Sequence, residues 1–357
     1  MKRKRVLVTP LDWGLGHATR CIPIIRLLLE EHCDVLIAGA GDSLNLLKIE
    51  FPELYFISLP AYQPRYPRRG SMMVTLLRQA IHFVRVVRQE HRVLEGIVRE
   101  NQIDYVISDN RYGCYSRKVP SVFITHQLTL LAPPQWGWLA FLANRVTGFY
   151  RNKFQHTWVP DWPGSLLTGK MSVDASKGIK FIGPLSRFRY LPGYSDQQTI
   201  DLLVLLSGPE PQRSMLEELI RKQLPPDGLG VVMVRGIPGN SQLRKENALE
   251  VYDHLPQQAL EGLLSRAKLV LCRSGYSTIM DLMAMHKQAI FIPTPGQTEQ
   301  EYFADRLLHA GVAWSMNQNT FDLKKALEES KKYTGFQEGI SGSDLLLRHL
   351  RSFLRQE

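Results

Sequence analysis

Residues 269–304 constrain the fold of this chain more than any other stretch. Two short apolar runs, at 269–272 and 289–292, are each followed by a turn and then by a helical pattern. This alternation predicts parallel strands joined by helices, and open sheets of this kind bind ligands at the carboxyl ends of their strands. The turn before the first helix is rich in small and hydroxyl-bearing residues: Ser274, Gly275 and Thr278. Free N–H groups and the helix dipole attract anions at such a place, so the stretch predicts a phosphate or nucleotide site.

The same alternation runs through the rest of the 357 residues in two blocks. The first block opens with an apolar strand at 5–9 and a glycine turn, and the second opens with a strand at 201–206. A chain of this length suggests two domains. The predicted fold class is α/β, with two Rossmann-like doubly wound domains facing a cleft. We expect three parts: an N-terminal domain at 1–190, a second domain at 198–340, and a C-terminal helix at 341–357 that packs back toward the first domain.

The composition is that of an ordinary soluble globular protein, with 44% hydrophobic and 22% charged residues. A formal net charge of +10 indicates an anionic partner. No zinc-finger or RNA-recognition motif is present, so we do not expect nucleic acid as that partner. The four cysteines lack metal-ligand spacing, and no apolar run resembles a signal peptide or a membrane span. These features predict a cytoplasmic protein.

Two basic segments suggest contact with an anionic membrane surface. A helical pattern at 73–100 places five cationic side chains close to one face: Arg78, His82, Arg85, Arg88 and Arg92. Residues 128–154 mix aromatic rings with arginine and lysine, which is typical of membrane interfaces. A solvated helix face and a core helix beside a surface loop explain the same patterns. A peripheral association with the inner face of the membrane is therefore one of two interpretations.

A glycine turn follows the first predicted strand. Gly14 and Gly16 permit a ligand to approach the backbone closely, and we expect them to form an acceptor or diphosphate loop. The GxGxxG fingerprint would need a small residue where Thr19 stands, so the turn does not predict a nicotinamide site. His17 lies directly after the turn, at the mouth of the predicted cleft.

The motif within residues 269–304 resembles the C-terminal domain of family 28 glycosyltransferases, which have the GT-B fold. The matching positions run from the turn into the following helices: Cys272, Arg273, Ser274, Gly275, Thr278, Asp281, Pro293, Gln297, Glu299 and Gln300. The glycine turn before His17 resembles the N-terminal glycine loop of the same family. The resemblance covers about 50 residues well and the two-domain plan loosely. It implies that the first domain binds the acceptor and the second binds a UDP-sugar donor.

The resemblance also assigns roles within the donor site. Ser274, Gly275 and Thr278 would bind the diphosphate, and Asp281 stands where the family has a ribose-binding glutamate. Gln297 belongs to the same motif. Glu299 and Gln300 stand where the family has two glutamines for the sugar hydroxyls, and Phe303 replaces its asparagine. These departures leave the donor sugar open between N-acetylglucosamine and another hexose.

The leaving diphosphate needs its charge neutralised, by a metal ion or by cations and helix dipoles. The chain contains no Asp-x-Asp pair, so we expect no metal ion and no other cofactor. Ser207 and Gly208 replace the family's glycine–serine loop. Arg213 and Arg235 follow them as candidate cations, because guanidinium groups match phosphate oxygens.

The attacking hydroxyl needs a base that works near neutral pH, and histidine is the natural choice. His17 is the first candidate, Asp109 is its possible orienting carboxylate, and His126 is the second candidate base. The alternatives are a structural contact of His17 with the glycine loop, a helix cap at Asp109, and a strand-end histidine bonded within the fold at His126.

These residues predict an inverting, metal-independent hexosyltransferase that moves a sugar from a UDP-sugar to a lipid-linked or other hydroxyl acceptor, such as a glycan. A nucleotide-sugar hydrolase or epimerase of the same fold is one alternative. A non-catalytic nucleotide-binding subunit is another.

Overall fold

The computed structural model describes most of the chain. The described ranges are 3–62, 80–131, 136–165, 167–173, 178–188, 199–208, 210–226, 228–237, 243–246, 249–337 and 343–355. These residues form two compact units, and the boundary between them lies between Leu185 and Ser186. This boundary comes slightly earlier than residue 190. Ser186 bonds to Asp281, and the carbonyl of Arg187 accepts a hydrogen bond from Gln257, so this segment is tied to the second unit.

The first unit contains a seven-stranded sheet in the order β3-β2-β1-β4-β5-β6-β7, and all its strand pairs are parallel. The strands are β1 (Arg5–Pro10), β2 (Asp34–Gly39), β3 (Tyr55–Ser58), β4 (Tyr105–Asp109), β5 (Ser121–Ile124), β6 (His156–Val159) and β7 (Ile179–Phe181). The chain builds the sheet outward from β1 to β3 and then returns to the other side of β1. A topological switch point therefore lies between β1 and β4.

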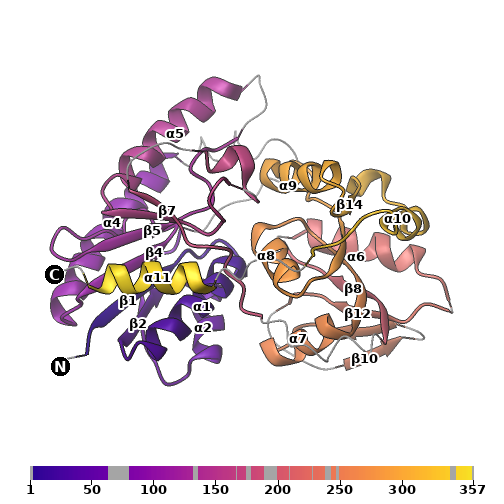
Figure 1. Ribbon diagram of the computed structural model, residues 1–357, viewed down its shortest axis with the longest axis horizontal. Coiled ribbons are helices and arrows are strands. Elements are labelled where there is room, and N and C mark those ends of the chain that lie inside the picture. The colour runs from indigo at the N-terminus through magenta and orange to yellow at the C-terminus, as the bar shows by residue number, and fades with distance from the viewer. Residues whose placement is uncertain are drawn as a thin grey trace. The chain divides into compact units, whose positions relative to one another are not determined.

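The helices of the first unit are α1 (Leu15–Glu30), α2 (Gly41–Glu50), α4 (Ala80–Glu100), α5 (Gly137–Arg151) and α11 (Ser343–Leu354), with a short 3₁₀ turn, η2 (Gly169–Met171). The C-terminal helix α11, drawn in yellow in Figure 1, belongs to this unit. Its Phe353 ring packs edge-on against Tyr105 and Trp158, and the Tyr105 hydroxyl donates to the carbonyl of Leu354 at 2.9 Å.

The second unit contains another seven-stranded sheet, in the order β10-β11-β9-β8-β12-β13-β14. Its strands are β8 (Ile200–Leu205), β9 (Val231–Val234), β10 (Leu243–Glu246), β11 (Leu249–Tyr252), β12 (Ala267–Cys272), β13 (Gln288–Phe291) and β14 (Trp314–Ser315). Only the β10–β11 pair among these is antiparallel. The switch point lies between β8 and β12.

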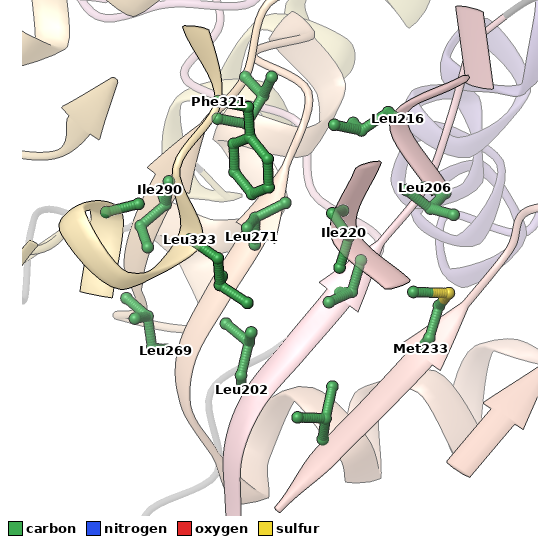
Figure 2. Packing of buried hydrophobic residues seen from close by; sticks show 14 of the residues in the cluster. Leu202, Leu206, Leu216, Ile220, Met233, Leu269, Leu271, Ile290, Phe321 and Leu323 are labelled. Atoms are coloured by element: carbon green, nitrogen blue, oxygen red, sulfur yellow. The ribbon is translucent and has the colours of Figure 1, made fainter. Parts of the chain in front are cut away.

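The helices of the second unit are α6 (Gln212–Gln223), α7 (Gln257–Arg266), α8 (Tyr276–Ala284), α9 (Thr298–His309) and α10 (Leu323–Ser330), with a 3₁₀ turn, η4 (Gln318–Thr320). Figure 2 shows the apolar cluster that joins this sheet to its helices. Leu216 and Ile220 of α6 are fully buried with Leu202 and Leu271 of the sheet, and Leu323 of α10 closes the same cluster. The apolar faces of α6 and α10 therefore fix these two helices on the sheet.

The predicted strands at 5–9, 201–206, 269–272 and 289–292 are confirmed within two residues. The strand at 243–246, the strand at 314–315 and the helix at 323–330 were not predicted, because their apolar patterns are short or interrupted. Arg78 and residues 73–79 of the predicted basic helix lie outside the described residues. On the described part of α4, the side chains of His82, Arg85, Arg88 and Arg92 are exposed.

Candidate active site

Three functional candidates of the first unit lie at adjacent strand ends. His17 is in the first turn of α1, directly after β1, Asp109 is the last residue of β4, and His126 follows β5. Because β1, β4 and β5 are neighbours and parallel, their carboxyl ends meet at one edge of the sheet. The predicted convergence of these side chains is thus observed, at the switch point of the sheet.

The glycine loop between β1 and α1 is held by α2. Gly14 adopts a φ of 80°, which favours glycine, and it immediately precedes the helix. The Ser43 hydroxyl donates to the carbonyls of Leu11 and Gly14, at 3.0 and 2.9 Å. Asp42 and Ser43 fit the sequence pattern of a helix cap, but the N-cap of α2 is Ala40, without a side-chain cap. Ser43 therefore stabilises the loop rather than its own helix.

Asp109 is a buried anion held by an arginine that the sequence did not single out. Arg20, one turn after His17 on α1, donates from Nε to Asp109 Oδ2 at 2.6 Å, and its Nη2 forms an ion pair with Oδ1. Burial alone would raise the pKa of Asp109, but Arg20 and His17 bring it down to about 2. Asp109 is consequently a fixed negative charge, and it caps no helix.

His17 lies between these two charges. Its Nδ1 is 2.8 Å from Arg20 Nη2 and 3.3 Å from Asp109 Oδ1. Burial and the neighbouring Arg20 lower the pKa of His17, and Asp109 opposes them only in part. The imidazole is therefore neutral at physiological pH, which is the state that a general base requires.

A second buried arginine, Arg111, ties the surrounding loops together. Its guanidinium donates to the Pro10 carbonyl at 2.8 Å and to Glu90 of α4 at 2.5 Å, and it pairs with Asp12 at 3.2 Å. Glu90 in turn accepts from the Tyr62 hydroxyl at 2.6 Å. This network fixes the turn after β4 against the glycine loop.

The second unit places its candidate residues at the carboxyl ends of β8, β12 and β13. Gly275 is the N-cap of α8 and Thr278 lies in its first turn, while Gly208, with a φ of 101°, lies in the exposed loop after β8. Ser274 is fully buried, and its hydroxyl donates to the carbonyl of Gln300 at 2.7 Å. This bond joins the β12 turn to the start of α9. The N–H groups of the first turn of α8 are suited to an anion.

Arg273 stabilises the carboxyl edge of the second sheet through hydrogen bonds to several segments. It is 1% exposed and donates to the carbonyls of Ile292, Pro293 and Gln212, and to the Gln318 side chain. Burial lowers its pKa to about 10, which still leaves it a cation. One buried guanidinium therefore fixes the ends of β12 and β13, the start of α6 and η4.

Asp281, on the second turn of α8, is a largely buried carboxyl, 14% exposed, whose hydrogen-bond donors are neutral groups. The Ser186 hydroxyl donates to its Oδ1 at 2.7 Å, and Arg187 Nε is 3.7 Å from Oδ2. Burial raises the pKa of Asp281 to about 6, against the smaller effects of Arg187 and Ser186. The carboxyl therefore sits in an apolar environment that does not fully stabilise its charge.

Known proteins resemble the chain both in sequence and in fold. Residues 234–335 match the glycosyltransferase family 28 C-terminal domain. The UDP-N-acetylglucosamine--N-acetylmuramyl-(pentapeptide) pyrophosphoryl-undecaprenol N-acetylglucosamine transferase of Histophilus somni is 24% identical over 346 residues, covering 91% of this chain and 88% of the relative. The transferase of the same name from Paenarthrobacter aurescens is 24% identical over 313 residues, covering 84% and 79%.

Solved structures share the architecture at lower identity. The spinosyn rhamnosyltransferase SpnG has a TM-score of 0.66 and 16% identity, covering 98% of this chain and 100% of that one. The MurG structure from Acinetobacter baumannii has a TM-score of 0.57 and 12% identity, covering 98% and 99%. This chain is a GT-B-fold glycosyltransferase that resembles family 28.

Two candidate cations of the glycosyltransferase are already paired with acids. Arg213 is buried and contacts Glu210 and Glu217, the latter at 3.3 Å. Arg235 donates to Glu217 at 2.9 Å and to Asp253 at 2.7 Å. These arginines shape the region after β8 and β9, but in this structure their charge is compensated within the protein. The exposed Ser207 lies in the same region.

The β13–α9 turn of the glycosyltransferase carries the remaining donor candidates. Gln297 is the N-cap of α9 and its N–H donates to the Thr294 carbonyl at 3.0 Å, while Gln300 Oε1 accepts from the Thr294 N–H at 2.8 Å. Glu299 is half-buried in the first turn of α9. Phe303, where the family has an asparagine, is buried and stacks on Tyr276 with ring centroids 5.3 Å apart. It packs in the core, so this position has no polar group to offer a sugar.

Sequence reasoning missed two features at this turn. The buried Thr294 hydroxyl has no hydrogen-bond partner among the described residues, and a Cβ at Gly208 would lie 3.9 Å from it. A pocket of about 300 Å³ adjoins the turn, lined by Pro293, Pro295, Glu301, Asn317, Gln318, Asn319 and Thr320. The described ranges contain no group of three or more histidine, cysteine, aspartate or glutamate residues arranged to hold a metal ion.

Proposed function

We propose that this glycosyltransferase moves a sugar from a UDP-sugar to a hydroxyl group of a lipid-linked acceptor, with inversion and without a metal ion. The observation that carries the proposal is the neutral His17 beside the anionic Asp109 at the switch point of the first sheet. A histidine–carboxylate pair is suited to accepting a proton from an attacking hydroxyl. Direct attack by the acceptor on the anomeric carbon gives inversion.

The donor half of the proposal rests on the second unit. The relatives named above use UDP-N-acetylglucosamine, and a SpnG structure similar to this chain, with a TM-score of 0.63, is complexed with thymidine diphosphate. The leaving diphosphate gains negative charge as the bond to the sugar breaks. The N–H groups at the start of α8, with Gly275 and Thr278, would stabilise that charge in place of a metal ion. Ser274, whose hydroxyl is bonded to the Gln300 carbonyl, would hold this turn in place. Asp281 would bind the ribose hydroxyls.

The donor sugar is N-acetylglucosamine or another hexose. Gln300 and Glu299 lie at the start of α9, where the sugar hydroxyls would bind. The buried Phe303 removes one polar contact that the family provides. This departure leaves the donor sugar open between N-acetylglucosamine and another hexose.

For the acceptor, we assign the role of general base to His17. The acceptor hydroxyl would give its proton to Nε2 while its oxygen bonds to the anomeric carbon and the diphosphate leaves. Asp109 Oδ1, 3.3 Å from Nδ1, would then stabilise the imidazolium. Asp109 itself remains ionised, because Arg20 holds its pKa far below neutrality. His126 is the second candidate, at the adjacent strand end.

A lipid-linked acceptor is supported by an exposed apolar stripe on α5. Trp138, Phe141 and Phe149 are 62%, 65% and 61% exposed, and Leu142 and Val146 lie between them on the same face. The helix also carries the exposed Arg145, and Lys153 lies 4.5 Å from the centre of the Phe149 ring. Aromatic rings flanked by cations suit the headgroup region of an anionic bilayer. No described helix is both long and apolar enough to cross a bilayer.

The transfer reaction is tested with purified protein, a panel of nucleotide sugars and N-acetylmuramyl-(pentapeptide) pyrophosphoryl-undecaprenol, the acceptor of the named relatives. We expect UDP and a UDP-sugar to raise the melting temperature, since ligands that bind the native state stabilise it. UDP release should require the acceptor, and H17Q should lower kcat by about 10²–10⁴-fold, the usual contribution of a general base. The matched control is H309Q, at an exposed histidine on α9.

Absence of any shift with millimolar UDP ligands would contradict the proposal. UDP release at the same rate without acceptor would favour a nucleotide-sugar hydrolase. Conversion of the donor to an epimer would favour an epimerase.

Membrane association is tested by flotation with vesicles of phosphatidylglycerol and phosphatidylcholine. We expect F141S to reduce binding several-fold, because the ring can no longer enter the headgroup region. The matched control is I49S, which removes another highly exposed apolar side chain, on α2. Equal loss in both variants would mean that α5 has no special role.

A further inference from the structure

Arg20 contacts three residues of the candidate active site, His17, Asp109 and His126, which we call the His17 cluster. Its side chain is 2% exposed, and its guanidinium contacts Asp109 through Nε and Nη2, His17 through Nη2 and His126 through Nη1. An arginine carries five N–H bonds in a planar fork and has no acceptor. Every one of these contacts is therefore a donation from Arg20.

The donations determine where the histidine protons lie. Arg20 Nη1 is 3.0 Å from His126 Nδ1, and Arg20 Nη2 is 2.8 Å from His17 Nδ1. A ring nitrogen can accept a hydrogen bond only when it carries no proton, and a neutral imidazole then carries its proton on Nε2. Both contacts therefore require a ring nitrogen Nδ1 without a proton, which places the proton of a neutral ring on Nε2.

For His17, the competing partner is Asp109. A bond from Nδ1–H to Asp109 Oδ1 would span 3.3 Å, beyond the usual range of about 2.7–3.2 Å for N–H···O. It would also place two donors, Nδ1–H and Arg20 Nη2–H, 2.8 Å apart. The contact with Arg20 is the better one, so it determines the resting tautomer.

We propose that Arg20 is a positioning residue that holds His17 and His126 as Nε2–H tautomers, and that His17 becomes a base only when Nδ1 turns from Arg20 to Asp109. The second half of this statement rests on the proposed function. In the shift one proton leaves Nε2 for water and one enters at Nδ1, so the charge of the ring is unchanged. Nδ1–H then donates to Asp109, and the Nε2 lone pair can take the proton of the acceptor.

The charged and titratable groups around His17 give the direction of the effect. Arg20 and His126 disfavour the protonation of His17, and Asp109 favours it. The Cys21 thiol contacts Asp109, with Sγ 3.7 Å from Oδ2. Replacing Arg20 by lysine keeps one charge for Asp109, but an ammonium group lacks the planar fork that reaches both imidazoles. Asp109 then becomes the better partner of His17 Nδ1.

The experiment is ¹⁵N NMR of the full chain with ¹⁵N-labelled histidine, because the ¹⁵N shifts and two-bond couplings distinguish the tautomers. Spectra of H17Q and H126Q assign the two rings among the ten histidines of the chain. We expect a protonated Nε2 and an unprotonated Nδ1 for both residues in the wild type at pH 7.5. An Nδ1–H tautomer or an imidazolium at either residue would overturn the proposal. This readout requires no substrate, so it stands or fails separately from the proposed sugar transfer.

The variant R20K extends the test to the reaction. We expect His17 to change to the Nδ1–H form, and the acid limb of the kcat/KM profile to move to higher pH. The matched control is R26K, on the same helix, where the arginine pairs with Glu50 outside the cluster. An unchanged His17 tautomer in folded R20K would overturn the role of Arg20. If R20K does not fold, the wild-type spectrum still decides the tautomer.

Discussion

Asp109 and Asp281 both lie near the carboxyl edges of their sheets, yet the pKa values of the two aspartates are shifted in opposite directions. Asp109 receives two N–H groups of the Arg20 fork, and its pKa falls to about 2. Asp281 receives one hydroxyl at 2.7 Å, while its nearest guanidinium nitrogen is 3.7 Å away, and its pKa rises to about 6. Removal from water disfavours a carboxylate in both places, and only a well-aligned cation reverses the effect.

The difference separates two kinds of functional carboxyl group. Asp109 is a permanent anion whose position is fixed by charge-assisted hydrogen bonds, so it can orient a histidine and stabilise its protonated form. Asp281 accepts a hydrogen bond from the Ser186 hydroxyl at 2.7 Å and one from the backbone N–H of Arg187, and neither donor is a charged group. A ribose hydroxyl could replace the Ser186 hydroxyl without leaving a cation unpaired. These differences suit Asp109 to the proposed electrostatic role and Asp281 to the proposed exchange of a partner with the ribose.

The largest expected effect is the loss of stability when the charge of Asp109 is removed. D109N leaves the Arg20 guanidinium buried without its counter-charge, which should cost about 3–5 kcal/mol of the free energy of unfolding. Urea denaturation at pH 7 measures it. The matched control is D34N, because Asp34 is 41% exposed and its arginine partners are 3.9 Å away, so its loss should cost less than about 1 kcal/mol. Equal losses in D109N and D34N would show that Arg20 is not held by charge.

The acid dependence of the wild type should reflect the same site. The pKa of Asp109 is lowered in the fold, so its contribution is present above the ordinary value of 3.8 and is lost as pH falls toward about 2. The unfolding free energy of D109N should lack this component of acid sensitivity.

D281N should act in the opposite direction on stability. The pKa of Asp281 is raised from 3.8 to about 6, so its favourable contribution is present at low pH and is lost as pH rises through about 6. A shift of this size corresponds to roughly 2–3 kcal/mol. Asparagine carries no charge, so D281N should match or exceed the wild-type unfolding free energy at pH 8. The advantage should shrink at pH 4.5, and urea denaturation at the two pH values measures it.

D281N should weaken UDP binding although it stabilises the fold. Loss of a charged hydrogen-bond acceptor for the ribose should raise the Kd of UDP by about tenfold, as measured by calorimetry. A stabilised D281N with unchanged UDP affinity would remove Asp281 from the donor site. A destabilised D281N at pH 8 would instead mean that Arg187 compensates the charge more fully than its 3.7 Å separation indicates.

The sequence predicted the surroundings of Asp109 better than those of Asp281. Strand periodicity placed His17, Asp109 and His126 at three parallel strand ends, and parallel strands bring such ends together whatever the details of side-chain packing. Arg20 was missed although it stands three residues after His17, the spacing that puts two side chains on one helix face. That spacing was the available signal, but many helices carry arginines at this distance from a histidine without any shared site.

The partners of charged residues were the least predictable feature. Arg213 and Arg235 were expected to be cations for the diphosphate, and the structure pairs them with acids that the sequence did not indicate: Glu210, Glu217 and Asp253. Asp253 follows β11, and its pairing with Arg235 depends on the β9–β11 register, which the sequence does not display. Ser186 lies 95 positions before Asp281, and only the folded chain brings them together.

The smallest expected effect is on the affinity for UDP when the hydrogen bond between Ser186 and Asp281 is removed. If a ribose hydroxyl replaces the Ser186 hydroxyl on Asp281, then UDP must break a 2.7 Å hydrogen bond in order to bind. S186A removes this competitor, and the Kd of UDP should fall about two- to fivefold, which corresponds to the lower part of the roughly 0.5–1.5 kcal/mol net that one such bond contributes. The matched control is S265A, whose hydroxyl donates to a carbonyl within α7. Because Ser186 also accepts from the Phe188 N–H, the stability of S186A is measured alongside its affinity. A weaker or unchanged affinity in a stably folded S186A would show that Ser186 and UDP do not compete, so that Asp281 serves the fold of the second unit rather than the ribose.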